Sequence, residues 1–312
     1  MPQRIALMVN PTAGKGRAAK SAAAAVEVLR AARVSVEVLI GRDVAEAQQL
    51  ALDAVARGTD ALVALGGDGM VHLAVQAVAT TTTPLGIIAA GTGNDLATCL
   101  GLPVGDVAAA ARCVADLLVR GVSTPTDAVR AGARWWACVL GSGFDSKVND
   151  RANRLRWPRG RARYNLAILA ELRVFRPLPF TVTYDGERVS TEAMLVAVGN
   201  AQSYGAGMRV LPDARVDDGL LDVMVLGPVS KPEFLKVFPK VYKGTHTTHP
   251  AVTIRRAREV TISSPGVSAY ADGEYLADLP VTNVCVPGAL RVLRPAAADP
   301  RDSTSRRADL GP

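Results

Sequence analysis

Residues 60–79 read DALVALGGDGMVHLAVQAVA, and this stretch decides the fold of the first part of the chain. The apolar run at 60–65 predicts a short buried strand, and the glycine-rich segment at 66–69 predicts a tight loop. Residues 70–79 then have the apolar spacing of a helix. A buried strand that leads through a glycine-rich loop into a helix is typical of a βαβ unit on a parallel sheet.

The same alternation of strand and helix extends outward from this stretch to about residue 125. Strands are expected at 4–10, 34–40, 60–65 and 85–90, with helices at 17–33, 43–57 and 70–79, Asp43 being the expected N-cap of the second helix. From Thr126 onward strands dominate, at 135–140, 180–184, 193–198, 220–225, 260–263, 281–286 and 290–293, with helices near 160–175 and 231–242.

This pattern predicts an α/β plus all-β protein. We expect residues 1–126 to form a Rossmann-like α/β domain, residues 127–294 to form a β domain, and the polar residues 295–312 to be a disordered tail.

Three loops follow predicted strands in the first domain: NPTAGKG at 10–16, GGDG at 66–69 and GTGND at 91–95. The carboxyl ends of parallel strands meet at one edge of a sheet, and glycine-rich loops that lead into helices bind phosphate through backbone N–H groups. The sequence therefore predicts a nucleotide site. It contains neither a GxxxxGK[ST] loop nor a GxGxxG segment, which argues against a P-loop NTPase and a dinucleotide dehydrogenase.

Asp68 lies inside one of these loops. A carboxylate in a phosphate loop repels its ligand unless a cation lies between them, so a Mg²⁺ ion that bridges Asp68 and the phosphates would remove the conflict. The alternative is that Asp68 only caps the helix that follows.

The charge of the chain points to an anionic partner. The net charge is +7 with a pI near 9.5, and residues 147–163 (KVNDRANRLRWPRGRAR) carry seven basic residues around one tryptophan. Such a segment favours an anionic membrane surface, although a solvated helix or a contact between subunits would have the same composition. Few stacking aromatics accompany it, so nucleic acid is not expected. The residues predicted to face the membrane are Lys147, Arg151, Arg154, Arg156, Trp157 and Arg159.

The remaining composition excludes several classes of site. The four cysteines are far apart and the three histidines are scattered, so neither a zinc site, a disulfide framework nor a catalytic triad is indicated. No run of about 18 apolar residues is present, and the N-terminal apolar run is too short for a signal peptide. We expect a cytoplasmic protein that associates peripherally with the inner face of the membrane.

The motifs, taken in order, resemble the diacylglycerol kinase catalytic-domain family, close to the bacterial soluble lipid kinases. The resemblance extends to about residue 294 and rests on the three loops above, on YGAGMRVLPDARVDDGLLDV at 204–223 and on YADGE at 270–274. The GGDG loop is shared with NAD kinases and phosphofructokinases, whereas the acidic segment at 217–222 followed by DGE is more specific to lipid kinases.

The resemblance implies a nucleotide domain of the NAD-kinase/phosphofructokinase type and a C-terminal β-sandwich, with the chain end near 290–295 returning to the first domain. It also implies that ATP lies on Asn10, Pro11, Thr12, Ala13, Gly14, Gly41, Gly66, Gly67, Asp68, Gly69, Met70, Val71, His72, Thr92 and Asn94. The family usually has Thr, Glu and Thr where this chain has Met70, Leu73 and Gly41, and these departures put the affinity for the nucleotide in doubt.

By the same resemblance, Asp218 would hold a structural Mg²⁺ together with the carbonyl oxygens of Arg215 and Leu220. A water-bridged network would connect this ion with Asp127 and Asp68. The residues themselves agree with this reading, since 217–219 is an acidic turn that suits a metal, although a solvated turn would look the same.

Glu274 would be the general base by the resemblance. A lipid alcohol must lose its proton as it attacks phosphorus, and a carboxylate can accept that proton. The plain alternative for residues 272–274 is an ordinary hairpin turn.

Together these observations predict an ATP-dependent, Mg²⁺-assisted kinase that converts diacylglycerol to phosphatidic acid in phospholipid metabolism. The alternatives are a kinase for a sphingoid base, ceramide or another lipid alcohol, an NAD kinase, and a non-catalytic lipid-binding module. A homodimer is compatible with the sequence, but nothing in it identifies an interface.

Overall fold

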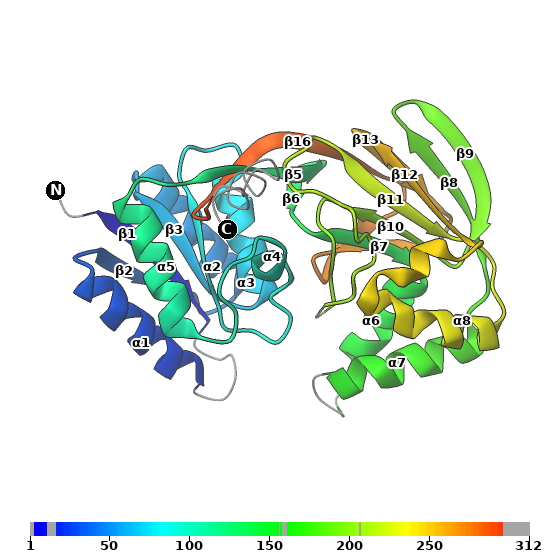
Figure 1. Ribbon diagram of the computed structural model, residues 1–312, viewed down its shortest axis with the longest axis horizontal. Coiled ribbons are helices and arrows are strands. Elements are labelled where there is room, and N and C mark those ends of the chain that lie inside the picture. The colour runs from blue at the N-terminus through cyan, green and yellow to red at the C-terminus, as the bar shows by residue number, and fades with distance from the viewer. Residues whose placement is uncertain (1–2, 11–16, 156, 158–160, 206, 296–312) are drawn as a thin grey trace, which may run out of the picture.

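A computed structural model describes the chain except for residues 1–2, 11–16, 156, 158–160, 206 and 296–312. Figure 1 shows an α/β half on the left and a β half with its own helices on the right, connected across the top by one long strand, β16 (Val281–Val292). Among the described residues no helix combines the length and the apolarity that crossing a bilayer requires.

The α/β half is built on four parallel strands in the order β2-β1-β3-β4. Their bounds are β1 (Arg4–Val9), β2 (Ser35–Leu39), β3 (Ala61–Gly66) and β4 (Leu85–Ala89). The helices are α1 (Arg17–Ala31), α2 (Val44–Ala56), α3 (Asp68–Val78), α4 (Asp95–Cys99) and α5 (Val107–Val119). Because β1, β3 and β4 are buried on both faces, they are almost entirely apolar.

Helices cover both faces of this sheet. Alternate residues of β1 divide between two apolar clusters, with Ile5 and Leu7 packing against α1 and α5, and Ala6 and Met8 packing on the side of α2 and α3. Helix α2 begins where the sequence predicts, since the Asp43 carboxylate accepts a 2.9 Å hydrogen bond from the Glu46 N–H.

The β half contains a six-stranded antiparallel sheet in the order β12-β11-β10-β7-β14-β15. A second layer, formed by β16, β13, β8 and β9, packs on it, and β5 and β6 continue that layer beside β16. The strands are β5 (Thr124–Ala131), β6 (Arg134–Trp136), β7 (Val139–Gly143), β8 (Leu178–Tyr184), β9 (Glu187–Ala193), β10 (Leu195–Gly199), β11 (Leu221–Leu226), β12 (Val252–Ala257), β13 (Glu259–Ser263), β14 (Ser268–Ala271) and β15 (Glu274–Asp278).

The core of the β half lies between these layers. Trp136, Leu140, Phe180 and Val260 are fully or almost fully buried in it. The indole N–H of Trp136 donates a 3.2 Å hydrogen bond to Asn283, so the polar atom of this large side chain is satisfied inside the core. The predicted fold class, α/β followed by a β-sandwich, is therefore confirmed.

Helices cover the outer face of the six-stranded sheet (Figure 1). They are α6 (Phe144–Arg154), α7 (Arg161–Val174), α8 (Lys231–Val237) and the 3-10 helices η1 (Phe238–Lys243) and η2 (Thr245–Thr248). Aromatic rings pack where α6, α7 and α8 meet, because the ring of Phe144 lies 5.3 Å from Phe175 and 5.0 Å from Phe234 between centroids.

Strand β16 pairs with strands of both halves, and it differs from the sequence prediction. It pairs with β13, then with β5, and finally with β4 through Val292 and Leu85. The sequence predicted two strands at 281–286 and 290–293 with a turn at Pro287-Gly288, but the pair with β5 resumes after a register shift between Val286 and Leu290. Gly288 has a φ of 62° and donates its N–H to the Asp127 carboxylate, so the expected turn is an irregularity within one strand.

A second correction concerns residues 135–140, which the sequence predicted as one strand. The structure has β6 and β7 with a break at Ala137 and Cys138, whose N–H groups both donate to the carboxylate of Asp272. The Asp272 side chain therefore takes the place of a neighbouring strand as the hydrogen-bond partner of these two N–H groups. The local sequence around 135–140 gives no sign of this break. Helices α4, α5 and α6 and strands β5, β9, β12, β14 and β15 were not predicted either.

Candidate active site

The loops after β3 and β4 contact each other at the carboxyl ends of these strands. The carboxylate of Asp68, the first residue of α3, accepts hydrogen bonds of 2.8 Å and 2.7 Å from the N–H groups of Asn94 and Asp95. Asn94 has a left-handed backbone (φ 59°), and its side-chain amide closes the second loop by two hydrogen bonds to the backbone of Gly91. The two predicted phosphate loops are therefore one hydrogen-bonded unit.

Glycine is required at this contact because the two backbones approach too closely for side chains. A Cβ atom on Gly91 would lie 2.3 Å from the Cα of Gly67, and one on Gly93 would lie 2.2 Å from Oδ2 of Asp68. The glycines thus leave the backbone of both loops open toward the cavity beside them.

A hairpin from the β half brings two further carboxylates, those of Asp272 and Glu274, to the loops that carry Asp68. Asp272 and Gly273 connect β14 to β15 with φ values of 53° and 86°, the positive values that a two-residue type I′ turn requires. The turn is fastened by Asp272, which accepts hydrogen bonds of 2.9 Å and 2.8 Å from Ala137 and Cys138. Glu274 follows at the start of β15, and its Oε1 lies 3.3 Å from the position that a Cβ on Gly69 would take.

Helix α3 contacts the hairpin and β6 through two polar side chains. Nδ1 of His72 lies 3.5 Å from Oδ2 of Asp272, and both side chains are buried. Gln76, one turn later, accepts a 3.0 Å hydrogen bond from the Trp135 N–H and donates to the Trp135 carbonyl. These contacts hold the loop that carries Asp68 against the hairpin that carries Glu274.

Two cavities meet at this contact. The first, of about 1280 Å³, lies in the α/β half along Gly66, Met70, His72 and Asn10. The second, of about 650 Å³, extends into the β half. Both are lined by the same residues where they meet: Gly67, Gly69, Gly91, Thr92 and Glu274.

The walls of the second cavity change character along its length. Four carboxylates, those of Asp68, Asp95, Asp272 and Glu274, lie at the end next to the loops. Beyond them the wall is mostly apolar, although it also includes Asn149, His246 and His249, and its apolar residues come from strands β10 and β11 and from helices α6, α7, α8 and η1. These apolar residues are Phe144, Val148, Ile168, Leu195, Met224, Leu226, Phe234, Val237, Phe238 and Val241.

The acidic end of the cavity has an unbalanced charge. Burial raises the pKa of Asp68, the nearby Asp272 carboxylate raises it further, and the N–H groups of Asp95 and Asn94 oppose the rise. Burial, followed by the charge of Asp272, also raises the pKa of the Cys138 thiol well above its ordinary value. A bound cation would relieve this repulsion.

Seven of the eleven described residues that were predicted to bind the nucleotide lie at the first cavity. Gly66, Gly67, Gly69, Met70, His72, Thr92 and Asn10 line it, and Asp68 lines the second cavity from the same loop. Val71 is buried in α3 and Asn94 organises the loop without lining either cavity. Gly41 lies against the start of α2, where a Cβ would meet the Ala47 N at 2.4 Å. Residues Pro11, Thr12, Ala13 and Gly14 fall outside the described residues.

The predicted structural metal residues lie in the turn before β11. The Asp127 carboxylate accepts 2.8 Å hydrogen bonds from the N–H groups of Gly219 and Gly288, which fastens this turn to β16. Asp218 accepts a 3.1 Å hydrogen bond from the Leu220 N–H and forms an ion pair with Arg256. Arg215 pairs with Asp217 at 3.3 Å. The Asp218 carboxylate therefore already has a guanidinium partner.

We expect Arg256→Ala to lower the free energy of unfolding at pH 7 by about 2 kcal/mol, because it leaves Asp218 and the buried Asp222 without their partner. This figure is below that of a fully buried pair, since Arg256 is 44% exposed. Burial raises the pKa of Asp222 and Arg256 opposes the rise, so the variant raises this pKa further. The folded state then binds the proton more tightly than the unfolded state, and the deficit should shrink as the pH falls from 7 through the raised pKa.

Urea unfolding of this variant at several pH values is the measurement. Arg120→Ala, which removes an exposed ion pair with Asp116, is the control and should cost less than about 1 kcal/mol. An equal loss in both variants, or a deficit that does not change with pH, would contradict the expectation.

The structure adds residues that the sequence did not single out. Asp95 lies in the GTGND motif and Asp272 in the YADGE motif, so their position beside predicted site residues could have marked them as site residues too. The apolar wall of the second cavity comes from elements that lie far apart in the chain, and no spacing in the sequence marks it.

Comparisons with known proteins agree with this geometry. Residues 4–131 match the family model described as the diacylglycerol kinase catalytic domain, and residues 138–294 match the model described as the YegS C-terminal NAD kinase beta sandwich-like domain. A protein named diacylglycerol kinase from Mycobacterium tuberculosis is 43% identical over 298 residues, which covers 94% of this chain and 95% of that protein.

Solved structures show the same fold. A crystal structure described as a diacylglycerol kinase from Bacillus anthracis superposes with a TM-score of 0.72 at 23% identity, covering 95% of this chain and 98% of that one. An NAD kinase from Archaeoglobus fulgidus in complex with ATP gives a TM-score of 0.54 at 13% identity over 94% of each chain. The expected NAD-kinase-type fold is confirmed, and from the sequence matches the chain belongs to the diacylglycerol kinase family of lipid kinases.

Proposed function

We propose that this protein transfers the γ-phosphoryl group of ATP to the free hydroxyl of diacylglycerol and releases phosphatidic acid for phospholipid metabolism. One observation carries the proposal: a cavity along phosphate-type loops and an apolar cavity meet at Glu274. A phosphate donor and a lipid acceptor placed in these two cavities would have their reacting groups beside the same carboxylate.

ATP would occupy the first cavity, with its phosphates on the backbone of the two loops. The glycine-rich loop after β3 lines this cavity, and the start of α3 that follows it provides partial positive charge for phosphate oxygens. Asn10 contributes a polar residue to the lining of this cavity.

The acceptor lipid would place an acyl chain in the second cavity. Its wall beyond the carboxylates is mostly aliphatic and aromatic, with Asn149, His246 and His249 as polar members, and this composition favours a hydrocarbon chain over the polar groups of NAD. The hydroxyl of a neutral glycerol headgroup would then lie at the acidic end, next to the loops.

Glu274 would act as the general base. Its carboxylate would accept the proton of the lipid hydroxyl while that oxygen forms the new bond to the γ-phosphorus and the bond to the β-phosphate oxygen of ADP breaks. Asp68 would contribute by position, since its two backbone hydrogen bonds hold the loops together at the point of transfer.

The acidic end fits a Mg²⁺ ion that arrives with the nucleotide. Among the described residues no cluster of three or more His, Cys, Asp or Glu side chains could hold a metal by itself. Mg²⁺ in kinases is commonly held by one or two carboxylates, phosphates and water. A Mg²⁺ ion at the acidic end would offset the repulsion between the carboxylates of Asp68 and Asp272. Bound there, Mg²⁺ would neutralise phosphate charge during transfer.

We expect Met224→Trp to raise the KM for a long-chain diacylglycerol at least tenfold and to leave ATP affinity unchanged. Met224 is buried on β11 and lines only the apolar cavity, so a larger side chain takes volume from the lipid and none from the nucleotide. Lipid KM and ATP binding should be measured together. The volume-conserving Met224→Leu is the control, and an unchanged lipid KM in a folded Met224→Trp protein would contradict the proposed lipid site.

A further inference from the structure

Helix α8 and the 3-10 helix η1 form one continuous two-sided segment. Its exposed residues recur in pairs at 231–232, 235–236, 239–240 and 242–243, which is the spacing of one face of a helix. Each pair combines one lysine with one apolar or ring-bearing residue. We call this face the lysine stripe, and it consists of Lys231, Pro232, Leu235, Lys236, Pro239, Lys240, Tyr242 and Lys243.

The opposite side of the same segment is the wall of the apolar cavity. Phe234, Val237, Phe238 and Val241 lie between the exposed pairs in the sequence, and all four line that cavity. Tyr242 belongs to both sides, because it lines the cavity and is 46% exposed. The lysine stripe is therefore separated from the proposed lipid site by the thickness of one helix.

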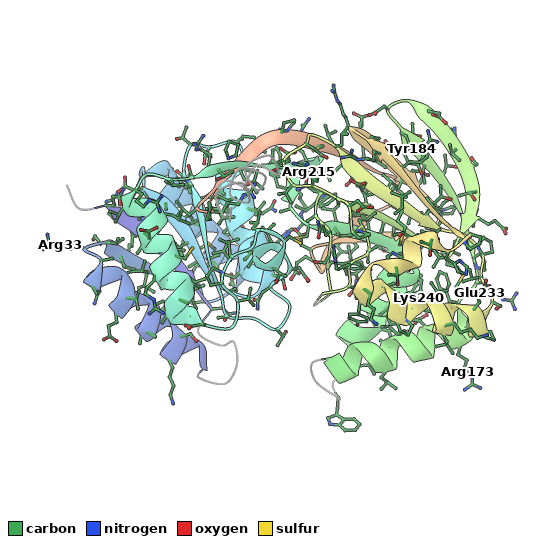
Figure 2. All side chains as sticks on the ribbon, in the orientation of Figure 1. Arg33, Arg173, Tyr184, Arg215, Glu233 and Lys240 are labelled. Carbon is green, nitrogen blue, oxygen red and sulfur yellow. The ribbon has the colours of Figure 1, made fainter. Side chains whose placement is uncertain are left out.

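The stripe is positively charged, with four lysines against one acid in the segment. The segment contains one acid, Glu233, and its carboxylate lies 3.2 Å from Nε2 of His249. Arg173, at the end of α7, is exposed beside the stripe, and its carbonyl accepts a hydrogen bond from Lys231. Figure 2 shows Lys240 and Arg173 on the helical side of the β half, whereas Arg33 lies at the opposite end of the molecule.

The basic segment at 147–163, which the sequence analysis predicted to face the membrane, has fewer exposed and unpaired cations than the stripe among its described residues. Arg151 forms a 2.5 Å ion pair with the buried Glu171, and Lys147 is half-buried in α6. Trp157 is 80% exposed, but the side chains of Arg154, Arg156 and Arg159 fall outside the described residues. Among the described lysines, those of the stripe and Lys20 on α1 are exposed, and only the stripe gathers several of them on one face.

We propose that the lysine stripe docks the protein onto an anionic bilayer, with Leu235 and Tyr242 entering the interface and the lysines contacting lipid phosphates. Lysines that alternate with exposed apolar side chains fit a membrane surface, where the charged ends extend to the headgroups and the apolar groups bury. This inference rests on the proposed function, since docking here would bring the bilayer to the wall of the lipid cavity.

The test compares two triple variants with equal loss of charge. Lys236→Gln, Lys240→Gln and Lys243→Gln remove three lysines of the stripe, and none of them lines a cavity described above. Lys20→Gln, Arg30→Gln and Arg112→Gln remove three exposed cations on α1 and α5 at the other end of the molecule. Sedimentation with vesicles of phosphatidylcholine and phosphatidylglycerol, without ATP or diacylglycerol, measures binding independently of catalysis.

We expect the stripe variant to bind these vesicles about 100-fold more weakly than the wild type at low salt, since each basic residue contributes to attraction by an anionic leaflet. The control variant should bind like the wild type. Unchanged binding by the stripe variant, or an equal loss in both variants, would overturn the proposal. A wild-type dimer that the stripe variant abolishes without any change in vesicle binding would also overturn it, because the stripe would then be a contact between copies.

Phosphorylation of a dispersed short-chain diacylglycerol separates this inference from the proposed function. The stripe variant should keep wild-type activity on that substrate while it loses activity on vesicles. If the wild type phosphorylates no diacylglycerol in either form, the proposed function fails, and the vesicle binding experiment still decides the docking surface.

Discussion

Replacing Glu274 by glutamine is expected to lower kcat by about 10²–10⁴-fold, the range that a positioned general acid or base contributes. Glutamine keeps the size of the side chain and cannot accept the hydroxyl proton. Glu274 is exposed where the two cavities meet, so the replacement should leave the fold and the KM for ATP unchanged. Steady-state kinetics with varied ATP and varied lipid separate these quantities.

Glu192→Gln is the matched control for this experiment. Glu192 is exposed on β9, which lines neither cavity, and its variant should have wild-type kcat. A Glu274→Gln protein that keeps more than about a tenth of wild-type kcat would remove Glu274 from the role of base, since general base catalysis contributes more than that.

Replacing Gly91 by alanine is expected to weaken ATP binding and to lower kcat by roughly 10²-fold, which is the rate effect that a displacement of about 1 Å has on an organised site. The new Cβ would lie 2.3 Å from the Cα of Gly67, and backbone atoms cannot rotate away as a side chain can. The two loops must therefore separate, which lengthens the hydrogen bonds that Asp68 accepts from the second loop.

Calorimetric titration of ATP, together with thermal unfolding, measures this effect. Gly227→Ala is the control, because its new Cβ would lie 3.5 Å from its nearest neighbour, an ordinary contact distance. Wild-type affinity for ATP in Gly91→Ala would show that the contact between the loops does not organise the nucleotide site.

The strands of the α/β half and its first three helices could be predicted from the sequence because their signals are local, whereas α4 and α5 were missed. Strands β1, β3 and β4 are runs of buried apolar residues, and the glycines that end β3 allow the close approach seen at Gly67 and Gly91. The β half was harder to predict. Strand β9 (ERVSTEA) is mostly exposed and has no clear apolar alternation, whereas α6 (FDSKVNDRANR) is mostly polar and shows its buried side through only Phe144 and Val148.

The site residues that could be predicted are likewise those in short local motifs, whereas contacts between distant parts of the chain could not be predicted. Asp68 and Glu274 lie in short motifs, and the structure brings both to the place where the cavities meet. The break between β6 and β7 depends on Asp272, more than 130 positions away along the chain, and so it has no local signal. The helix near 231–242 was predicted, but its lysine face was not singled out, because which side of this helix lies on the cavity depends on how the β half packs.

The central claim is phosphoryl transfer from ATP to diacylglycerol, and one measurement tests it most directly. Purified protein should be incubated with γ-labelled ATP, Mg²⁺ and mixed micelles of anionic lipid and long-chain diacylglycerol, with Glu274→Gln alongside and with sphingosine, ceramide and NAD as competing acceptors. The account predicts labelled phosphatidic acid from the wild type and almost none from the variant. Labelled NADP, or label on a sphingoid base or ceramide with none on diacylglycerol, would contradict it.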